Sequence, residues 1–436
     1  MSSATVTAPS AEASRAREPL PGPPGSRLPR FFQGMHMLLT EHRMLERYRR
    51  RYGEVFKIDT WPFDPLVVVS EPAEVRRIFT GDTSVLHAGE GNGILGPLVG
   101  PHSVLLLDEA EHLRRRKLLL PPFHGERMRV YGDVMRSLAD AEVDRWPVGE
   151  PFPMLEAMQR VTLRVILRTV FGYEEGARMD ALEAAILRLL GRTQVMMVNV
   201  LQRDLGRFSP WTRFLDARDA VDAMLFEEID RRRTAGGEGD DVLSMLLASD
   251  ATDKELRDDL ITLLVAGHET TATTMAWTIE RLVRHPAALD AARVDSDHLD
   301  AAIKEAQRVR PVITYVMRKL QAPLEVGGYL VPAGATLGTS VTLMHRRPDL
   351  YPDPHAFRPE RFLGVKPETY GWIPFGGGVR RCLGAAFAQY EMKQVLGAIL
   401  ERCELRAPDP RPERHQRKMI TFVPRQGARV VVTARR

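Results

Sequence analysis

The chemistry of this 436-residue chain centres on Cys382, one of only two cysteines. Cys382 follows a glycine-rich turn that begins at Phe375, and a helical pattern starts at Leu383. A cysteine at a helix N-terminus faces unpaired N–H groups and the positive end of the dipole, which favour the thiolate. Without a CxxC pair it cannot hold a structural zinc or an iron–sulfur cluster. It can be the single axial ligand of a haem iron, because the porphyrin supplies four ligands.

Five positions of this stretch form the pattern Phe-x-x-Gly-x-Arg-x-Cys-x-Gly: Phe375, Gly378, Arg380, Cys382 and Gly384. The glycines permit a tight turn and a close approach to a flat ligand. A lone cysteine after a glycine turn is otherwise a buried structural residue. The full pattern resembles the haem-binding loop of the cytochrome P-450 monooxygenases, and the resemblance runs from about Pro21 to the C-terminus. It implies haem b, with Cys382 on the iron and the other four residues contacting the cofactor.

A long helix should position the second half of the site. The Thr252–Glu255 stretch has the sequence of a capping box, and the helical pattern after it runs to about Arg284. At 1.5 Å per residue such a helix is roughly 45–50 Å long and crosses a domain. Within it, Ala266 and Gly267 are small enough for a flat ligand or dioxygen to lie against that face. We therefore expect both to border the cofactor.

An acid and an alcohol, Glu269 and Thr270, follow directly in an apolar segment of this helix. A carboxylate there is costly unless it is hydrogen-bonded or functional. The residues alone equally allow a helix kink in which Thr270 bonds back to a carbonyl. In the family that the sequence resembles, this pair relays protons during oxygen activation, so both residues are expected to be catalytic. His268 is interpreted as a polar helix residue and not as a ligand.

Haem carries two carboxylates, which need cationic partners if they are buried. The resemblance assigns this role to His112 and Arg116, four apart on one helix face, and to Arg318 and Arg380. Each of them alone would be an ordinary surface charge.

A second charged group is expected to stabilise the fold. Glu305 and Arg308 share one helix face at a spacing of three, which alone would indicate a surface ion pair of little energetic worth. The resemblance implies instead a buried pair behind the haem, with Arg361 of the Pro359–Phe362 loop as its partner. We expect all three to be structural.

The fold class is mainly α with a small β region, matching the helical prism of the cytochrome P-450 fold. Strands are expected at 55–58 and 66–69, at 324–340, and near 420–422 and 429–433. Helices are expected from Met35 to Tyr52, at 71–80, from Glu109 to Leu120 and at 297–309. The stretch 87–103, with five glycines and two prolines, is interpreted as a loop. Residues 1–30 are expected to form a disordered polar, Pro-rich tail before a single domain at 31–436.

The amino-acid composition argues against a nucleic-acid-binding protein and against a disulfide-stabilised one. A net charge of +4 is no nucleic-acid signature, and two cysteines exclude a disulfide framework and suit a reducing cytoplasm. No stretch approaches the ~20 apolar residues of a membrane span. We therefore expect a cytoplasmic monomer that does not bind nucleic acid and does not span a membrane.

The function implied is insertion of one oxygen atom from O2 into a small hydrophobic substrate of steroid, terpenoid, fatty acid or polyketide type. A haem-thiolate isomerase or peroxygenase and a haem-based sensor are the alternatives; neither would need the acid–alcohol pair. The expected substrate walls are apolar stretches where the family builds its pocket, represented by Leu98, Met197, Leu263, Val312, Ile313 and Thr421. The 87–107 loop and the segment 196–200 are expected to form a mobile lid.

Electrons are expected to come ultimately from NAD(P)H through a ferredoxin reductase and a small acidic ferredoxin. Since 436 − 382 = 54 residues follow Cys382, we expect no flavin reductase to be fused there. Arg114, Arg115, Lys117 and Arg381 form the predicted basic docking patch, which would steer an acidic partner.

Overall fold

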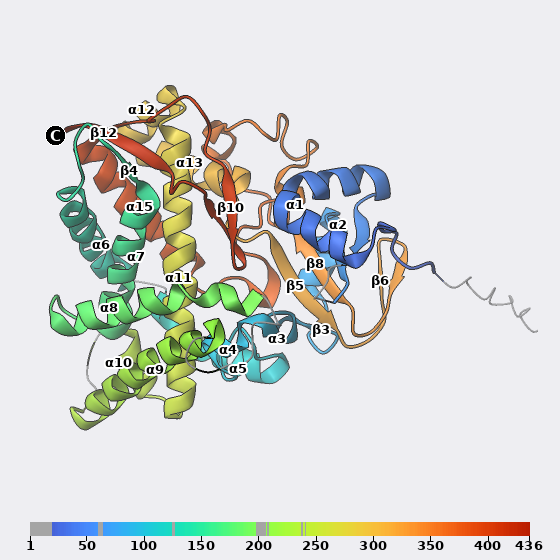
Figure 1. Ribbon diagram of the computed structural model, residues 1–436, viewed down its shortest axis with the longest axis horizontal. Helices are drawn as coiled ribbons and strands as arrows, with labels where there is room; N and C mark the ends of the chain where they lie inside the picture. The colour runs from blue at the N-terminus through green and yellow to red at the C-terminus, as the bar shows by residue number, and fades with distance from the viewer. Residues whose placement is uncertain are drawn as a thin grey trace, which may run out of the picture.

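Helices dominate the chain and fill the left and lower parts of Figure 1, while the larger sheet lies on the right. This computed structural model describes residues 20–59, 64–123, 127–197, 206, 209–236, 239 and 241–436. The α-helices within these residues are α1 (Arg30–Tyr52), α2 (Pro72–Thr80), α3 (Ala88–Gly91), α4 (Gly96–Val99), α5 (Glu109–Leu119), α6 (Arg127–Val143), α7 (Met154–Phe171), α8 (Ala177–Leu190), α9 (Pro210–Thr234), α10 (Val242–Leu247), α11 (Asp253–Leu282), α12 (Pro286–Val294), α13 (Ser296–Val309), α14 (Val341–His345) and α15 (Ala385–Arg402). Short 3-10 turns are η1 (Gly93–Leu95), η2 (Pro121–Phe123), η3 (Thr193–Met197), η5 (Pro359–Phe362) and η6 (Gly378–Arg380).

The strands form four sheets. They are β1 (Val55–Ile58), β2 (Leu66–Val69), β3 (Leu86–His87), β4 (Pro151–Pro153), β5 (Tyr315–Leu320), β6 (Leu324–Val326), β7 (Tyr329–Val331), β8 (Thr336–Ser340), β9 (Cys403–Arg406), β10 (His415–Lys418), β11 (Thr421–Pro424) and β12 (Arg429–Arg435). The largest sheet has the order β1-β2-β8-β5-β3, with β1 and β2 paired as the predicted hairpin. The other sheets are β4-β12-β9, β10-β11 and β6-β7. The sequence prediction of a mainly α fold with a small β part is confirmed.

The 30-residue helix α11 crosses the middle of the molecule, with α7 packed along it. Its predicted capping box is present: Glu255 N donates to Thr252 Oγ1 at 3.3 Å, and Thr252 N donates to Glu255 Oε2 at 2.9 Å. Most residues of α11 are buried, because α7, α9, α13, α15 and β11 all pack against this helix. A rigid rod of roughly 45 Å thus fixes where its central residues lie.

The stretch interpreted as a loop, 87–103, instead contains β3, α3, η1 and α4. Its glycines separate short helical turns, and Leu98 and Val99 at the end of this stretch are buried in the core. The His87 ring nitrogens lie 2.7 Å from Glu90 Oε1 and 2.9 Å from Glu109 Oε1, which joins this segment to α5. Propensity alone misses such turns because tertiary packing stabilises them.

The N-terminal boundary also differs from the prediction. Residues 1–19 lie outside the described residues, but Pro24 O accepts a bond from Lys57 N at 2.7 Å and Pro21 O accepts one from Leu330 N at 3.0 Å. The stretch 21–25 is therefore bound to the sheets and does not belong to a tail ending at residue 30. Helix α1 begins at Arg30, five residues before the predicted start, and has a kink at Thr40.

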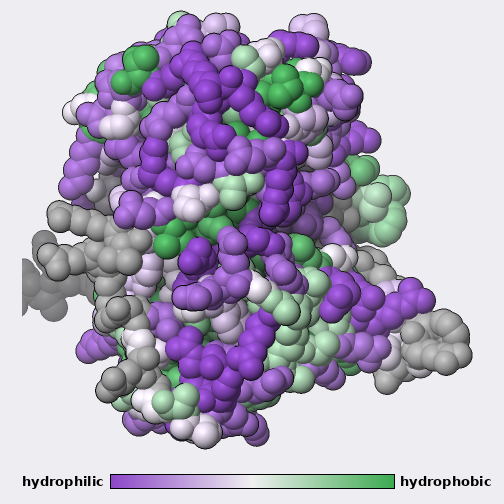
Figure 2. Space-filling view, turned by 90° about the vertical axis from the view of Figure 1, so that its left-hand side faces the viewer, coloured by the Kyte–Doolittle hydropathy of each residue, from purple (hydrophilic) through white to green (hydrophobic). Residues whose placement is uncertain are grey.

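The molecular face in Figure 2 is mainly hydrophilic, with hydrophobic residues gathered in smaller patches. Within the described residues, no helix is long and apolar enough to cross a membrane.

Candidate active site

Cys382 lies in a tight turn three residues before α15 begins at Ala385. Its N–H donates to Phe375 O at 3.0 Å, and the next bond back, Arg381 N to Gly378 O, is 3.1 Å long. The turn needs glycine at two positions, since Gly376 and Gly378 have φ of 64° and 62° in the left-handed region. The Cys382 side chain is accessible, whereas Cys403, the other free thiol, is buried at the start of β9.

The glycines of this turn also allow contact with α2. A Cβ on Gly378 would collide with the carbonyl oxygen of Phe79, and one on Gly377 would collide with the Phe79 ring. The close approach that we expected toward a flat ligand is therefore used here by another helix. At Gly384 a Cβ would meet nothing within 4 Å, so this position does leave room beside the sulfur.

The acidity of Cys382 differs from the simple helix-terminus expectation. Although part of the Cys382 side chain is accessible, protein surrounds the sulfur closely enough for desolvation to raise the pKa of the thiol. An N–H bond from Gly384 and the charges of Arg116 and Arg381 lower this pKa, but by less than desolvation raises it. The position of Cys382 near a helix N-terminus is therefore not sufficient to favour the thiolate over the thiol. A metal cation bound at the sulfur would supply the missing stabilising charge, since coordination deprotonates a thiol.

The four expected partners of the haem carboxylates converge in space. Arg380 lies 2.5 Å from Asp108 Oδ1, and Arg318 donates to Met317 O at 2.7 Å while lying over the Phe79 ring. Arg116 has no hydrogen bond or ion pair within the described part of the chain. Asp108 is the one carboxylate ion-paired with the group there, so three guanidinium groups and His112 share a single counter-charge.

The pKa values reflect this excess of positive charge. Burial and then the charge of Arg380 lower the pKa of His112 to about 4. Burial lowers the pKa of Arg318 and of Arg380 to about 10, and each has a neighbouring arginine that lowers it further. Burying like charges together is costly without anions. A group with two carboxylates, such as haem, fits this cluster.

One residue in the middle of α11 is exposed although most of this helix is buried. Ala266 is exposed although Leu264 and His268 on either side are buried. Thr270 Oγ1 donates to Ala266 O at 2.7 Å, which is the back-bond expected at a kink. Gly267 has a different role, which is to let α7 approach α11 closely. A Cβ at this position would lie 2.9 Å from Ile166 Cδ1.

Glu269 does not bond to Thr270 within the described residues. Its Oε2 accepts from Gln159 Nε2 of α7 at 2.9 Å, and its Oε1 accepts from Lys418 Nζ of β10 at 3.1 Å. His268 is fully buried against α7, with Nδ1 2.9 Å from Thr162 Oγ1. Burial lowers the pKa of His268 to about 4, so it is neutral.

The expected structural group is present. Arg308 donates to both Glu305 oxygens at 2.7 Å, and both side chains are fully buried. Arg361 Nε lies 3.4 Å from Glu305 Oε1. The remaining Arg308 donors reach three carbonyl oxygens at 2.7–2.9 Å, those of His345, Pro354 and Ala356. One ion pair thus fixes α13 to the chain before η5.

The family model for Cytochrome P450 matches residues 21–431. The chain belongs to this family. The putative cytochrome P450 135B1 of Mycobacterium tuberculosis is 40% identical over 433 residues, covering 95% of this chain and 92% of that protein. The putative cytochrome P450 137 of the same species is 39% identical, with the same coverage.

Solved structures agree in fold. The retinoic acid-bound cyanobacterial CYP120A1 has a TM-score of 0.84 and 23% identity, covering 95% of this chain and all of that one. The cytochrome P450DA heme domain has a TM-score of 0.83 and 23% identity, covering 96% and 99% of the two chains. As a P450, this protein is a haem-dependent monooxygenase.

The expected substrate walls of this P450 are brought together only in part. Ile313 forms a bridge with Thr421, and Phe422 N donates to Val312 O at 2.9 Å, so these stretches are adjacent. Leu263 lies one turn of α11 before Ala266 and Gly267. Leu98 is instead a core residue, 1% exposed. Residues 198–200 and the Met197 side chain lie outside the described residues.

The predicted docking patch needs a correction. Arg115 is 0% exposed, and its Nη2 lies 2.7 Å from Asp259 Oδ2 of α11. Its neighbour Arg114 is 52% exposed and pairs with Glu255 at 3.0 Å. Lys117 and Arg381 are exposed. Arg115 therefore lies on the side of α5 that is ion-paired with α11.

Three functional candidates were missed from the sequence: Gln159 and Lys418 on Glu269, and Asp108 on Arg380. Asp108 also accepts the N–H groups of Gly89 and Glu90 at 2.9 and 3.1 Å. No spacing connects Lys418 with Glu269, 149 positions away. Asp108 stands just before a helix, and this position indicates a cap rather than a partner for a distant arginine.

Proposed function

We propose that this P450 inserts one oxygen atom from O2 into a C–H or C=C bond of a small hydrophobic substrate of steroid, terpenoid, fatty acid or polyketide type. One observation carries the proposal: an accessible cysteine in a glycine turn lies near a cluster of buried cations that has Asp108 as its single counter-charge among the described residues. Haem b, when bound, supplies the redox chemistry that no side chain can provide.

The residues of the chain have distinct parts in this proposal. Cys382 Sγ would ligate the iron, and Arg116, Arg318, Arg380 and His112 would hold the two carboxylates of the cofactor. Phe375, Gly378, Gly384, Ala266 and Gly267 would border it. The substrate would lie against Leu263, Val312, Ile313 and Thr421.

Protons would reach the site through α11. Thr270 Oγ1 donates its proton to Ala266 O in this structure. Rotation of the Thr270 side chain about χ1 would point the hydroxyl proton toward the exposed side of Ala266 instead. Glu269 accepts a hydrogen bond from Gln159 and forms an ion pair with Lys418. The Lys418 side chain is one-third exposed, so Lys418 connects this part of the helix with solvent. Opening of these two bonds would let the carboxylate carry a proton inward to Thr270.

Thr270→Ala should leave cofactor binding intact and divert most electrons from product to hydrogen peroxide, because the proton-delivering hydroxyl is lost. A substrate is first identified by its shift of the Soret band, and peroxide per electron consumed is then measured. Thr274→Ala is the matched control, since Thr274 Oγ1 bonds back to Thr270 O at 2.8 Å. Unchanged coupling in Thr270→Ala would make Thr270 purely structural. Turnover that needs no electron donor would favour the isomerase or peroxygenase, and absence of turnover the sensor.

We also propose a small acidic ferredoxin as the electron donor, reduced by NAD(P)H through its reductase. The supporting surface is the exposed pair Lys117 and Arg381, with Arg114 beside them; Arg381 directly precedes Cys382. Two free thiols support a reducing cytoplasm as the site of action.

Lys117→Glu should slow reduction by the ferredoxin about tenfold at low salt, and the difference should shrink as salt screens the charges. Stopped-flow reduction across a range of ionic strength measures this. Arg411→Glu, which changes a loop arginine that is 88% exposed, is the control and should have no effect. Equal rates for the wild type and Lys117→Glu at low salt would place the docking face elsewhere.

A further inference from the structure

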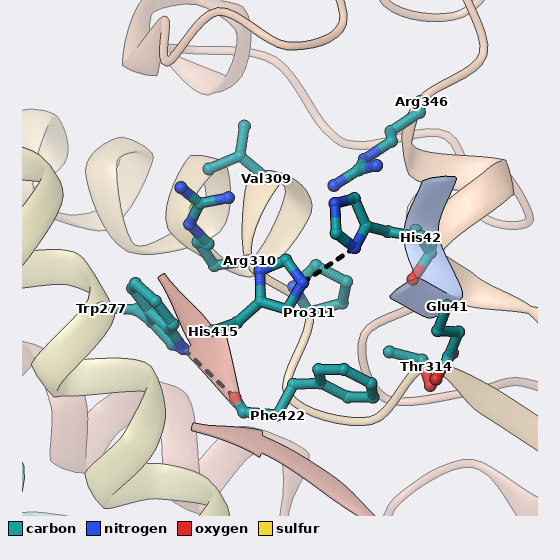
Figure 3. Close-up of a pocket in the computed structure, with 11 residues that line it drawn as sticks. Glu41, His42, Trp277, Val309, Arg310, Pro311, Thr314, Arg346, His415 and Phe422 are labelled. Carbon is teal, nitrogen blue, oxygen red and sulfur yellow. Dashed lines mark hydrogen bonds between the residues drawn. The ribbon is translucent and has the colours of Figure 1, made fainter. Parts of the chain in front are cut away.

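A second cavity lies between α1, the end of α13, α14 and the β10–β11 hairpin (Figure 3). Its volume is about 360 Å³, including space that is continuous with solvent. Arg310, Arg346, His42 and His415 line it together with the aromatic side chains of Trp277 and Phe422. The cavity therefore has a cationic part and an apolar part.

Arg310 is the central charge of this cavity. It has no hydrogen bond or ion pair within the described residues, and its Nε is buried without a partner. Its guanidinium lies 5.1 Å from the centroid of the Trp277 ring, which stabilises the cation without neutralising it. Burial lowers the pKa of Arg310 to about 10, so it remains charged at neutral pH.

Two carboxylates near the cavity, those of Glu46 and Glu41, already have ion-pair partners. Arg346 Nη1 lies 2.6 Å from Glu46 Oε1, and Glu41 is ion-paired with Arg417. Glu280 and Glu413 also act on the charge of Arg310, but Glu280 is ion-paired with Arg281 and Arg284, and Glu413 accepts three backbone N–H groups. Arg310 therefore has no direct counter-ion among the described residues. A buried cation without an anion is costly, which is a reason to look for an anionic ligand.

Two histidines complete the cationic part. His42 Nδ1 and His415 Nε2 lie 3.0 Å apart, at hydrogen-bond distance, and Figure 3 shows Arg310 beside His415 and Arg346 beside His42. Burial and then Arg346 lower the pKa of His42 to about 4, and burial and then His42 lower that of His415 to about 3. Both rings are neutral and able to take up a proton when an anion enters.

The cavity is separate from the haem site. Phe422 lines it, whereas the adjacent Thr421, an expected substrate wall, points to the opposite face of β11 because side chains alternate along a strand. Trp277 lies seven residues beyond Thr270 on α11, roughly 10 Å further along the helix.

We propose that this cavity binds a small organic carboxylate. Its carboxylate would accept charge-assisted bonds from Arg310, in the planar geometry that arginine offers, and from a protonated His42 or His415. Its apolar body would lie against Trp277 and Phe422. The site is distinct from the substrate site of the proposed oxygenase and does not depend on it.

Benzoate is a suitable probe, with neutral benzamide of the same shape as the control ligand. Calorimetric titrations use the holoenzyme saturated with a haem-ligating azole, which keeps the probe out of the haem site. Benzoate should bind at least tenfold more tightly than benzamide, and also more tightly than inorganic phosphate, which lacks an apolar body. Arg310→Gln should weaken benzoate binding at least tenfold, in line with the loss of a charged hydrogen-bond partner. Arg76→Gln should not, since Arg76 lies over Tyr370, outside this cavity.

Proton uptake gives a second signature. Binding should tighten by about tenfold from pH 8 to pH 6, because the bound anion favours the protonated histidine pair. The charged groups that face the pair from the surrounding elements are Arg43, Glu46, Arg310 and Arg346. The dependence would come from protonation of the histidine pair.

If Arg310→Gln does not fold, His415→Gln gives the same test and should abolish most of the pH dependence. Equal affinity for benzoate and benzamide, or unchanged benzoate binding in the folded variants, would overturn the proposal. Phosphate binding as tight as that of benzoate would overturn the assignment of an organic ligand.

Discussion

Cys382→Ala should abolish monooxygenase activity and the red-shifted Soret band of the reduced carbon monoxide complex. Cys382 is the accessible thiol of the chain, held by the bond from its own N–H to Phe375 O. Thiolate donation favours O–O cleavage, and no neighbouring side chain can replace it. We expect a loss of activity of several orders of magnitude, measured as product per electron supplied.

Cys403→Ala is the matched control for this experiment. Cys403 is buried at the start of β9, and burial raises the pKa of its thiol. Its replacement should retain both the spectrum and the activity, at the modest stability cost of a small cavity. A normal Soret band in Cys382→Ala, or a lost one in Cys403→Ala, would overturn the ligand assignment.

Arg308→Ala should lower the free energy of unfolding by about 3–5 kcal/mol, the range for breaking a buried ion pair. The substitution leaves Glu305 charged and buried, and it removes the donors to three carbonyl oxygens. We expect little protein to retain haem, because the chain before η5 would lose its link to α13. Denaturant unfolding and the haem content of purified protein measure the two effects.

A second pair with the same i,i+3 spacing provides the control. Arg77 lies 2.9 Å from Glu74, but its side chain is 55% exposed. Arg77→Ala should therefore cost less than about 1 kcal/mol. Similar losses from both substitutions would mean that burial of the Glu305–Arg308 pair contributes nothing.

Local signals in the sequence were sufficient for much of the fold. The Thr252 capping box and the glycine turn before Cys382 depend on residues a few positions apart, and the β1–β2 hairpin pairs residues from Ile58–Leu66 out to Val55–Val69, at most 69 − 55 = 14 positions apart. Such features are stabilised by neighbours along the chain, so a pattern predicts them. The prediction of a loop at 87–103 was wrong because the short helices there are stable only when they pack against the rest of the protein.

Pairing between distant residues was decided by the tertiary structure. Arg115 and Lys117 are two positions apart in one basic run, yet one is buried against Asp259 and the other is exposed. Glu269 pairs with Lys418 across 149 positions, and His42 with His415 across 373 positions. The sequence by itself determined the helix, the turn and the cysteine that define the family. Which charges are buried, and which have partners, depends on the surfaces that folding brings together, because desolvation and Coulomb energy act through space and not along the chain.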